Sequence, residues 1–120
     1  MRKFHLDLIG GLARKLDAVP EGDGTMLDNT VIVFFAEYGD RHHPSFFTWP
    51  MVTLGSWGGT LKTGRYLQYP NHGAAGHATL GNFYTTLLHA AGMPQKGFGN
   101  RDVRLGADID QTAPLDHLLT

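Results

Sequence analysis

The residues best suited to chemistry in this sequence are a carboxylate and several histidines that follow an apolar segment. Glu37 comes directly after the apolar run 31–36, and His42 and His43 follow it within six residues. His77 lies further along the chain, in a segment rich in glycine. Imidazole nitrogens and carboxylate oxygens bind divalent cations such as Zn²⁺, Mn²⁺ and Ca²⁺. We therefore expect a divalent metal site whose candidate ligands are Glu37, His42, His43 and His77.

A catalytic zinc or manganese site needs about three protein ligands and one open position. Glu37 with one of the two adjacent histidines supplies two, so the third must come from elsewhere in the chain. His72 is the alternative to His77 for that role. A purely structural interpretation also stays open, in which Glu37 forms an ion pair with nearby Arg41 and the histidine pair lies on the surface of a turn.

Basic residues beside a glycine give a candidate anion site. Lys62 and Arg65 flank Gly64 and are suited to contact the oxygens of a sulfate or phosphate group; the alternative is a solvated hairpin edge. The glycine-rich loop 55–59 is not followed by the Lys-Ser/Thr pair of a nucleotide-binding loop, so we expect no nucleotide cofactor. The catalytic nucleophile is unknown, because Ser56 lacks the flanking pattern of a nucleophile elbow.

Composition excludes several classes of function. The 120 residues include 10 Lys and Arg against 11 Asp and Glu, a net charge of −1, whereas nucleic-acid binding needs a basic surplus. There is no cysteine, which excludes disulfides and thiolate chemistry. No apolar run approaches the roughly 20 residues that cross a bilayer, and none resembles a secretion signal. We therefore expect neither a nucleic-acid partner nor a membrane span.

Apolar periodicity predicts two helices. Residues 3–16 carry apolar side chains at helical spacing, and residues 80–91 do the same over three turns. Thr79 is placed to cap the second helix, and Gly92 and Pro94 are placed to end it. Residues 95–120 show little periodicity, and we expect an extended C-terminal tail.

Between the helices the sequence predicts strands. Residues 31–36 are apolar without alternation, which is typical of a strand covered on both faces of an α/β sheet. We expect a second strand at 51–54 and a hairpin at 61–67 around Gly64. The predicted fold class is α/β, a short mixed sheet flanked by helices, with an α/β domain over residues 1–94 and a tail over residues 95–120. A buried strand needs neighbours on both sides, so we expect a homo-oligomer or a missing N-terminal region to complete the sheet.

Three blocks of this sequence, in order, resemble a known bacterial family. They are residues 21–33 (EGDGTMLDNTVIV), residues 58–67 (GGTLKTGRYL) and residues 82–88 (NFYTTLL). Over about residues 4–100 the chain is similar to the C-terminal region of the domain-of-unknown-function family fifteen-fifty-two, the HXXSHH-motif family. That family is similar to sulfatase-like proteins of the alkaline phosphatase superfamily. The resemblance implies a partial or minimal alkaline-phosphatase-like α/β/α sandwich.

The same resemblance implies what chemistry the metal site would serve. Relatives place a metal-binding Asp followed by His or Asn at the end of the matching strand, where this sequence has Glu37 and Tyr38. It implies hydrolysis of phosphate or sulfate esters, an exported location, and a missing N-terminal part that carries the nucleophile. The alternatives are a non-catalytic interaction domain that assembles as an oligomer, and a small histidine-ligated metalloprotein.

Overall fold

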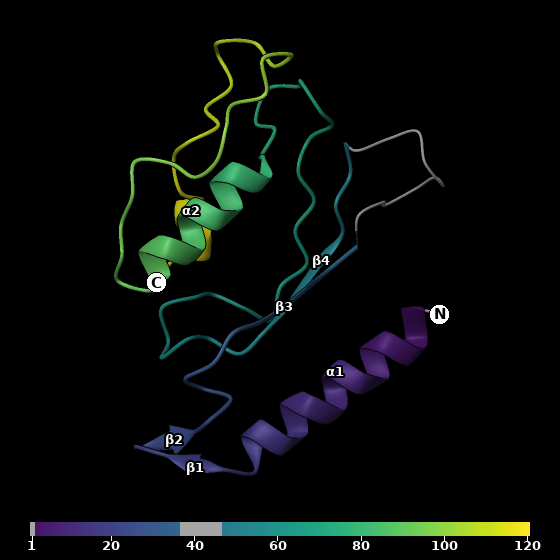
Figure 1. The fold of residues 1–120 in the computed structure, drawn as a ribbon, viewed down its shortest axis with the longest axis vertical. Helices are drawn as coiled ribbons and strands as arrows, with labels where there is room; N and C mark the ends of the chain where they lie inside the picture. Colours follow the sequence, from purple (N-terminus) through teal and green to yellow (C-terminus); the bar gives the residue numbers. More distant parts are fainter. Residues whose placement is uncertain (1, 37–46) are drawn as a thin grey trace.

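The computed structural model describes residues 2–36 and 47–120. In chain order its elements are α1 (Arg2–Asp17), β1 (Pro20–Glu21), β2 (Gly24–Thr25), β3 (Ile32–Phe35), β4 (Met51–Leu54), α2 (Leu80–Ala90) and a 3-10 helix (Asp116–Leu118) (Figure 1). The fold is mixed α/β, as expected, but instead of one mixed sheet the described chain contains two short antiparallel sheets. The predicted ligands Glu37, His42 and His43 lie outside the described residues.

β3 and β4 form the central sheet by antiparallel pairing. Side chains alternate along a strand, so Phe34 lies on one face of the sheet and Val33 on the other. The Phe34 ring stacks on His5 of α1, with ring centroids 6.3 Å apart, and this contact brings α1 to one face. Val31, which shares the face of Val33, lines a cavity together with Leu87 of α2. The two helices thus lie on opposite sides of the sheet (Figure 1).

Both predicted strand positions are confirmed, but the sheet is not the covered one that the sequence predicts. In the described chain β3 pairs with β4 alone, and no residue of either strand is buried. Phe35 is 43% exposed and Val52 is 40% exposed. A central strand of a sandwich pairs on both sides and removes its apolar side chains from water. Here both strands are edge strands within the described residues.

The predicted hairpin at 61–67 is wrong. Leu61 instead forms an antiparallel bridge with Leu119, and the Lys62 amide donates to the Leu118 carbonyl at 2.8 Å. Gly64 bends the chain with a φ of +72° but no second strand follows it. The small β1–β2 hairpin has no counterpart among the expected elements, because two-residue strands carry no periodicity that a sequence can reveal.

The first predicted helix is confirmed, and α1 keeps part of its apolar face in solvent. Phe4, Leu8 and Leu12 follow one side of the helix at intervals of four residues. Their exposed fractions are 63%, 56% and 47%. Neither helix of the described chain is long and apolar enough to cross a membrane. The apolar stripe of α1 is therefore only partly covered by the rest of the described chain.

The second predicted helix is also confirmed, and α2 begins at a capping box. Thr79 Oγ1 accepts from the Asn82 amide at 3.2 Å, while the Asn82 side-chain oxygen accepts from the Thr79 amide at 2.9 Å. Each partner satisfies a backbone donor that the first turn of a helix leaves unpaired. At the other end the Gly92 amide donates to the His89 carbonyl at 3.0 Å, with Gly92 at a φ of +71°.

Asn82 also ties the C-terminal segment to α2. Its side-chain amide donates to the carbonyls of Asp110 and Ala113 at 3.1 and 2.8 Å. One turn further along α2, Thr86 Oγ1 accepts from the Leu115 amide at 2.8 Å. Asn82 is 3% exposed, so water does not compete for these bonds. Residues 95–120 lack regular structure apart from the 3-10 helix, yet they are held on α2 by specific contacts.

The approach of this segment requires a glycine. A Cβ at Gly81 would lie 2.9 Å from the Gln111 carbonyl oxygen, closer than side-chain carbons come to such atoms. Leu105 and Ile109 of the segment are buried. The C-terminal residues therefore contribute to the core instead of trailing from it.

We expect Asn82→Ala to lower the free energy of unfolding by about 2–4 kcal/mol, because it removes half of a capping box and takes the side-chain donor from the carbonyls of Asp110 and Ala113. Urea unfolding followed by circular dichroism measures the change. Asn100→Ala is the matched control: Asn100 is exposed, and its loss should cost within about 0.5 kcal/mol. Equal stability of the two variants would contradict the anchoring role of Asn82.

Candidate functional site

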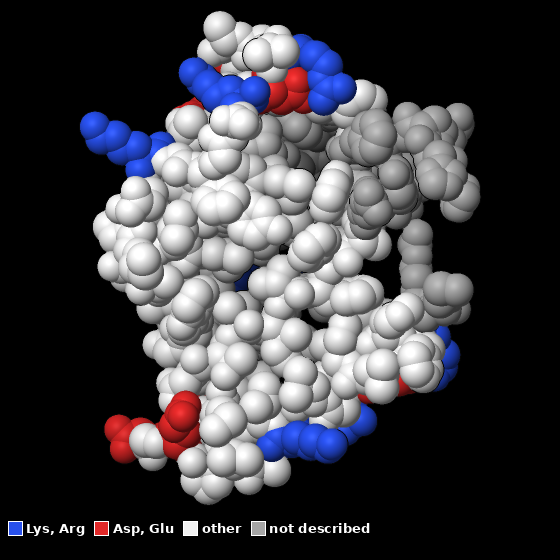
Figure 2. Space-filling view, viewed as in Figure 1, with Lys and Arg blue, Asp and Glu red and all other residues white. Residues whose placement is uncertain are grey.

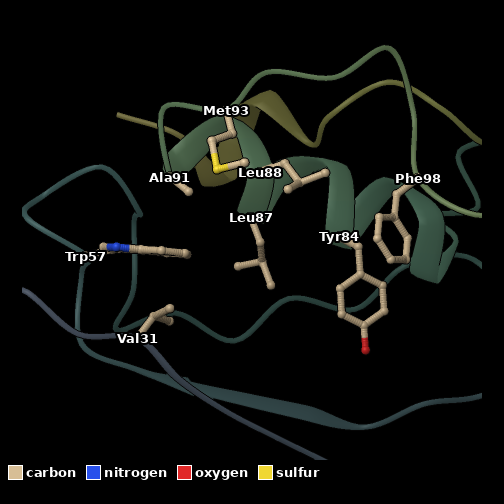
Figure 3. A pocket seen from close by; sticks show the side chains of 8 residues that line it. All are labelled: Val31, Trp57, Tyr84, Leu87, Leu88, Ala91, Met93 and Phe98. Atoms are coloured by element: carbon tan, nitrogen blue, oxygen red, sulfur yellow. The ribbon is translucent and has the colours of Figure 1, made fainter.

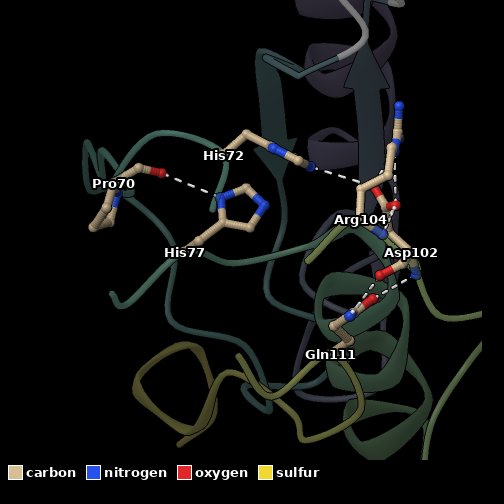
Figure 4. Close-up of polar contacts among 6 residues, drawn as sticks. All are labelled: Pro70, His72, His77, Asp102, Arg104 and Gln111. Carbon is tan, nitrogen blue, oxygen red and sulfur yellow. Dashed lines mark hydrogen bonds and ion pairs between the residues drawn. The ribbon is translucent and has the colours of Figure 1, made fainter. Parts of the chain in front are cut away.

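The described histidines that come closest together are His72 and His77, at the two ends of one loop. The loop is folded by short turns, in which the Ala74 amide donates to the Asn71 carbonyl at 2.9 Å and the His77 amide donates to the Ala74 carbonyl at 3.0 Å. Gly76 takes a φ of +81°, a conformation that favours glycine. The two imidazole rings meet edge to face, with centroids 5.3 Å apart (Figure 4).

Each of the two rings has one nitrogen fixed by an oxygen acceptor. His77 Nδ1 lies 3.2 Å from the Pro70 carbonyl, and His72 Nε2 lies 3.3 Å from a carboxylate oxygen of Asp102. A carbonyl and an ionised carboxylate only accept hydrogen bonds, so these nitrogens carry the protons. In the neutral rings the lone pairs are then on Nε2 of His77 and Nδ1 of His72. Histidines that bind metals in proteins usually donate their other ring N–H to an oxygen in the same way.

Asp102 is itself held from several directions. Its Oδ1 accepts from the Arg104 amide at 2.9 Å and from Arg104 Nε at 2.8 Å, and its Oδ2 accepts from Arg104 Nη2 at 2.7 Å. Gln111, which is buried, pairs with the Asp102 backbone: its Oε1 accepts from the amide at 2.7 Å and its Nε2 donates to the carbonyl at 3.1 Å. The hydrogen bonds from Arg104, and to a lesser degree the one from His72, hold the pKa of Asp102 well below its usual range.

An aromatic ring covers one side of this cluster. The Phe47 ring lies 4.3 Å from the His72 ring, centroid to centroid, and the Arg104 guanidinium lies 5.5 Å from the Phe47 centroid. A guanidinium at this distance from a ring is attracted to its negative face. Phe47, His72, His77, Asp102 and Arg104 are hereafter called the imidazole cluster.

The described part of the imidazole cluster does not by itself complete a metal site. Within residues 2–36 and 47–120, no three His, Asp or Glu side chains lie close enough to hold an ion. His77, one of the predicted ligands, is brought beside His72, the alternative third ligand. Glu37, His42 and His43 fall in the part of the chain that is not described. The four-ligand set therefore stays a prediction.

The predicted anion-binding residues lie elsewhere, beside the 3-10 helix. Arg65 Nη2 donates to the His117 carbonyl at 2.7 Å and to the Lys62 carbonyl at 3.3 Å, so the guanidinium fastens one chain segment to another. Tyr69 Oη lies 2.8 Å from His117 Nε2, and burial raises the pKa of Tyr69 against the opposing effect of Arg65. Anion binding by Lys62 and Arg65 stays a prediction.

Sequence reasoning missed three members of the imidazole cluster, Phe47, Asp102 and Arg104, and also missed Gln111, which supports Asp102. Asp102, Arg104 and Gln111 belong to a segment without periodicity, in which an acid two residues before an arginine is typical of a solvated loop. Their proximity to His72 depends on contacts across 30 residues of chain, which no local pattern reveals.

An apolar concavity lies apart from the imidazole cluster, between α2 and the central sheet. It has a volume of about 410 Å³ and is lined by Val31, Trp57, Leu87 and Phe98 among others (Figure 3). Trp57 takes a φ of +50°, a left-handed conformation that costs a bulky residue about 1–3 kcal/mol. The walls offer almost no polar group to orient a ligand, so we interpret this cavity as incomplete packing of α2 on the sheet.

Comparisons with known proteins give this chain no relative. No family model, no curated protein and no solved structure matches it. The interpretation of its function depends on its own residues.

Asp102 stabilises the fold while it is ionised, so its contribution depends on pH. Because its folded pKa lies below the usual value of about 3.9, the contribution is complete above about pH 5 and is lost as the pH falls through the depressed value. We expect Asp102→Asn to show a smaller loss of unfolding free energy on acidification than the parent chain. Urea unfolding at successive pH values below about 6 measures the slope.

Asp23→Asn provides the control for that experiment. Asp23 is an exposed residue of the β1–β2 turn, and its substitution removes one negative charge without touching the cluster. An acid-side slope that Asp102→Asn leaves unchanged would contradict the contacts with Arg104 and His72.

Proposed function

We propose that this chain supplies part of a divalent metal site in a phosphate- or sulfate-ester hydrolase of the alkaline phosphatase and sulfatase type. The observation that carries the proposal is the contact of Phe47 with His72 at 4.3 Å. Phe47 comes four residues after His43, so the segment with three predicted ligands leads in the sequence to the imidazole cluster. A site that joins Glu37, His42 or His43 to His77 is consistent with this connection.

The chemistry of the cluster favours a metal over other ligands. Two neighbouring imidazoles each have one ring nitrogen fixed by an oxygen, which leaves the other nitrogen as the donor. Two described imidazoles are fewer than the three protein ligands of a catalytic centre, and the proposal assigns the remainder to residues 37–43. A bound Zn²⁺ or Mn²⁺ would supply Lewis-acid polarisation of an ester oxygen and a low-pKa water.

The described residues have supporting roles in this proposal. Asp102 holds the His72 ring in one orientation and tautomer, and Arg104 keeps that carboxylate ionised. Phe47 covers the ring and excludes water from one side of it. The resemblance of residues 21–33, 58–67 and 82–88 to the HXXSHH-motif family supports the same reaction class, and with it an exported location and an α/β/α sandwich completed by further sequence.

A second candidate function is a non-catalytic interaction domain. The specific observation in its favour is that β3 and β4, the most apolar of the described strands, contain no buried residue. Exposed apolar strands favour a partner that covers them. The metal proposal does not explain why these strands are exposed. A small histidine-ligated metalloprotein without hydrolytic activity is the third alternative, and it is separated from the first by assay of ester hydrolysis.

Titration of the purified chain with Zn²⁺ and Mn²⁺ by calorimetry tests the metal proposal. We expect one ion per chain, bound at least about tenfold more weakly by His77→Ala and by the double variant Glu37→Ala/His43→Ala, because each loses a donor. His89→Ala is the matched control: this histidine of α2 contacts the Gln95 carbonyl outside the cluster, and its removal should leave affinity within about twofold.

Two results would contradict the proposal. One is the absence of binding; the other is equal affinity in the parent chain and in His77→Ala. The metal-loaded chain is then assayed with p-nitrophenyl phosphate and p-nitrophenyl sulfate. Turnover of either ester that disappears with a chelator supports the hydrolase.

A further inference from the structure

The outer edge of β3 has no partner within the described chain. β3 pairs with β4 on one side, and no other strand among residues 2–36 and 47–120 pairs with its outer side. Natural proteins protect such edges with charges, proline or a covering element, because an open edge pairs with other strands. Residues 31–36 contain no charge, no proline and no glycine. This edge is therefore suited to pair with another strand.

The surface around the sheet is apolar as well. Phe35 at the end of β3 is 43% exposed, and Leu8 and Leu12 of α1, on the side of the sheet that Phe34 faces, are 56% and 47% exposed. Figure 2 shows an uncharged centre on one face of the molecule, with Lys, Arg, Asp and Glu gathered toward its rim. Uncharged centres with charged rims are typical of protein interfaces.

The chain exposes more surface than a compact protein of its mass, by an amount comparable to the area that one subunit buries in a stable dimer. A compact protein of this 13.2 kDa mass exposes roughly 6,400 Å². The chain exposes 8270 Å², which is roughly 1,900 Å² more. Obligate dimers bury roughly 1,000–2,500 Å² on each subunit. Its radius of gyration of 15.7 Å likewise exceeds the roughly 13.6 Å of a compact 120-residue domain.

We propose that β3 is the seam of a homodimer, in which it pairs antiparallel with β3 of a second copy. A second copy is the partner that these features fit, because the strand is apolar throughout and a net charge of −1 gives little repulsion between copies. The pairing turns two two-stranded sheets into one four-stranded sheet and removes both β3 edges. This inference deepens the second candidate function and does not depend on the metal site.

The symmetry of such a pair fixes its geometry. A two-fold axis normal to the sheet keeps each face on its own side, so α1 of both copies lie on the same face and bring their apolar stripes toward each other. Opposite residues of antiparallel strands share a face, so at the axis a residue lies opposite its own copy in the other strand and not opposite the copy of its neighbour. Val33 and Phe34, in the middle of β3, are the two candidates for that residue.

Cysteine substitution tests the seam directly, because the chain has no cysteine of its own. Residues opposite each other in antiparallel strands have Cα atoms about 4.5–5.5 Å apart, within the span of a disulfide. We expect either Val33→Cys or Phe34→Cys to form a disulfide-linked dimer under mild oxidation. Val52→Cys is the control: it is on β4, and the two β4 strands of the dimer are roughly 14 Å apart.

Light scattering of the parent chain accompanies the cross-linking. We expect twice the 13.2 kDa chain mass at about 100 μM, and a shift of at least tenfold toward monomer in Phe35→Lys, which places like charges near the seam. A parent chain that stays monomeric overturns the proposal. So does a dimer that Val52→Cys links as well as the β3 variants, or that no β3 variant links. Because Phe35→Lys leaves the imidazole cluster intact, zinc titration of that variant separates failure of the seam from failure of the metal site.

Discussion

The position of the imidazole cluster depends on one buried side chain, Asn82. Its amide caps α2 and at the same time holds the carbonyls of Asp110 and Ala113, so the C-terminal segment is fixed against the helix. Gln111, between those two residues, clamps the backbone of Asp102. Asp102 in turn fixes the His72 ring. A polar group with little access to water costs free energy when it lacks a hydrogen-bond partner. The arrangement in which all of these hydrogen bonds form is therefore favoured over the others.

In the central sheet, by contrast, apolar side chains stay partly exposed to water within the described chain. β3 and β4 have a helix on each side, yet neither strand buries a residue and a cavity of about 410 Å³ remains beneath α2. Burial of apolar surface is worth roughly 25 cal/mol per Å², so a surface of this kind favours association. The fold and the proposed assembly are therefore connected: a partner strand would supply what the sheet lacks.

The elements that the sequence predicts correctly are those encoded by local periodicity. Both helices follow apolar residues at helical spacing, and Thr79 and Gly92 mark the ends of α2. The strands at 31–36 and 51–54 follow from apolar runs between turn residues. The hairpin around Gly64 is wrong because the glycine is a local signal, whereas the pairing of Leu61 is with Leu119, far along the chain.

The residues of the candidate site likewise include some that the local sequence reveals and some that it does not. His77 and His72 could be singled out because two histidines that enclose Gly73 and Gly76 are conspicuous in a sequence, but their contact with each other requires the fold of the loop. Asp102 and Arg104 could not be singled out, because a hydrogen bond across 30 residues leaves no trace in local spacing. Residues 37–43 supply the remaining predicted ligands and lie outside the described structure.

The most direct test of the central claim, that His72 and His77 are prepared to bind a metal ion, is the ¹⁵N imidazole NMR spectrum of the chain during addition of Zn²⁺. Without metal, the structure predicts that His77 carries its proton on Nδ1 and His72 on Nε2. Zinc should then shift the unprotonated nitrogens of these two rings and leave His89 unchanged. The reverse tautomers, or zinc-induced shifts confined to other histidines, would contradict the account.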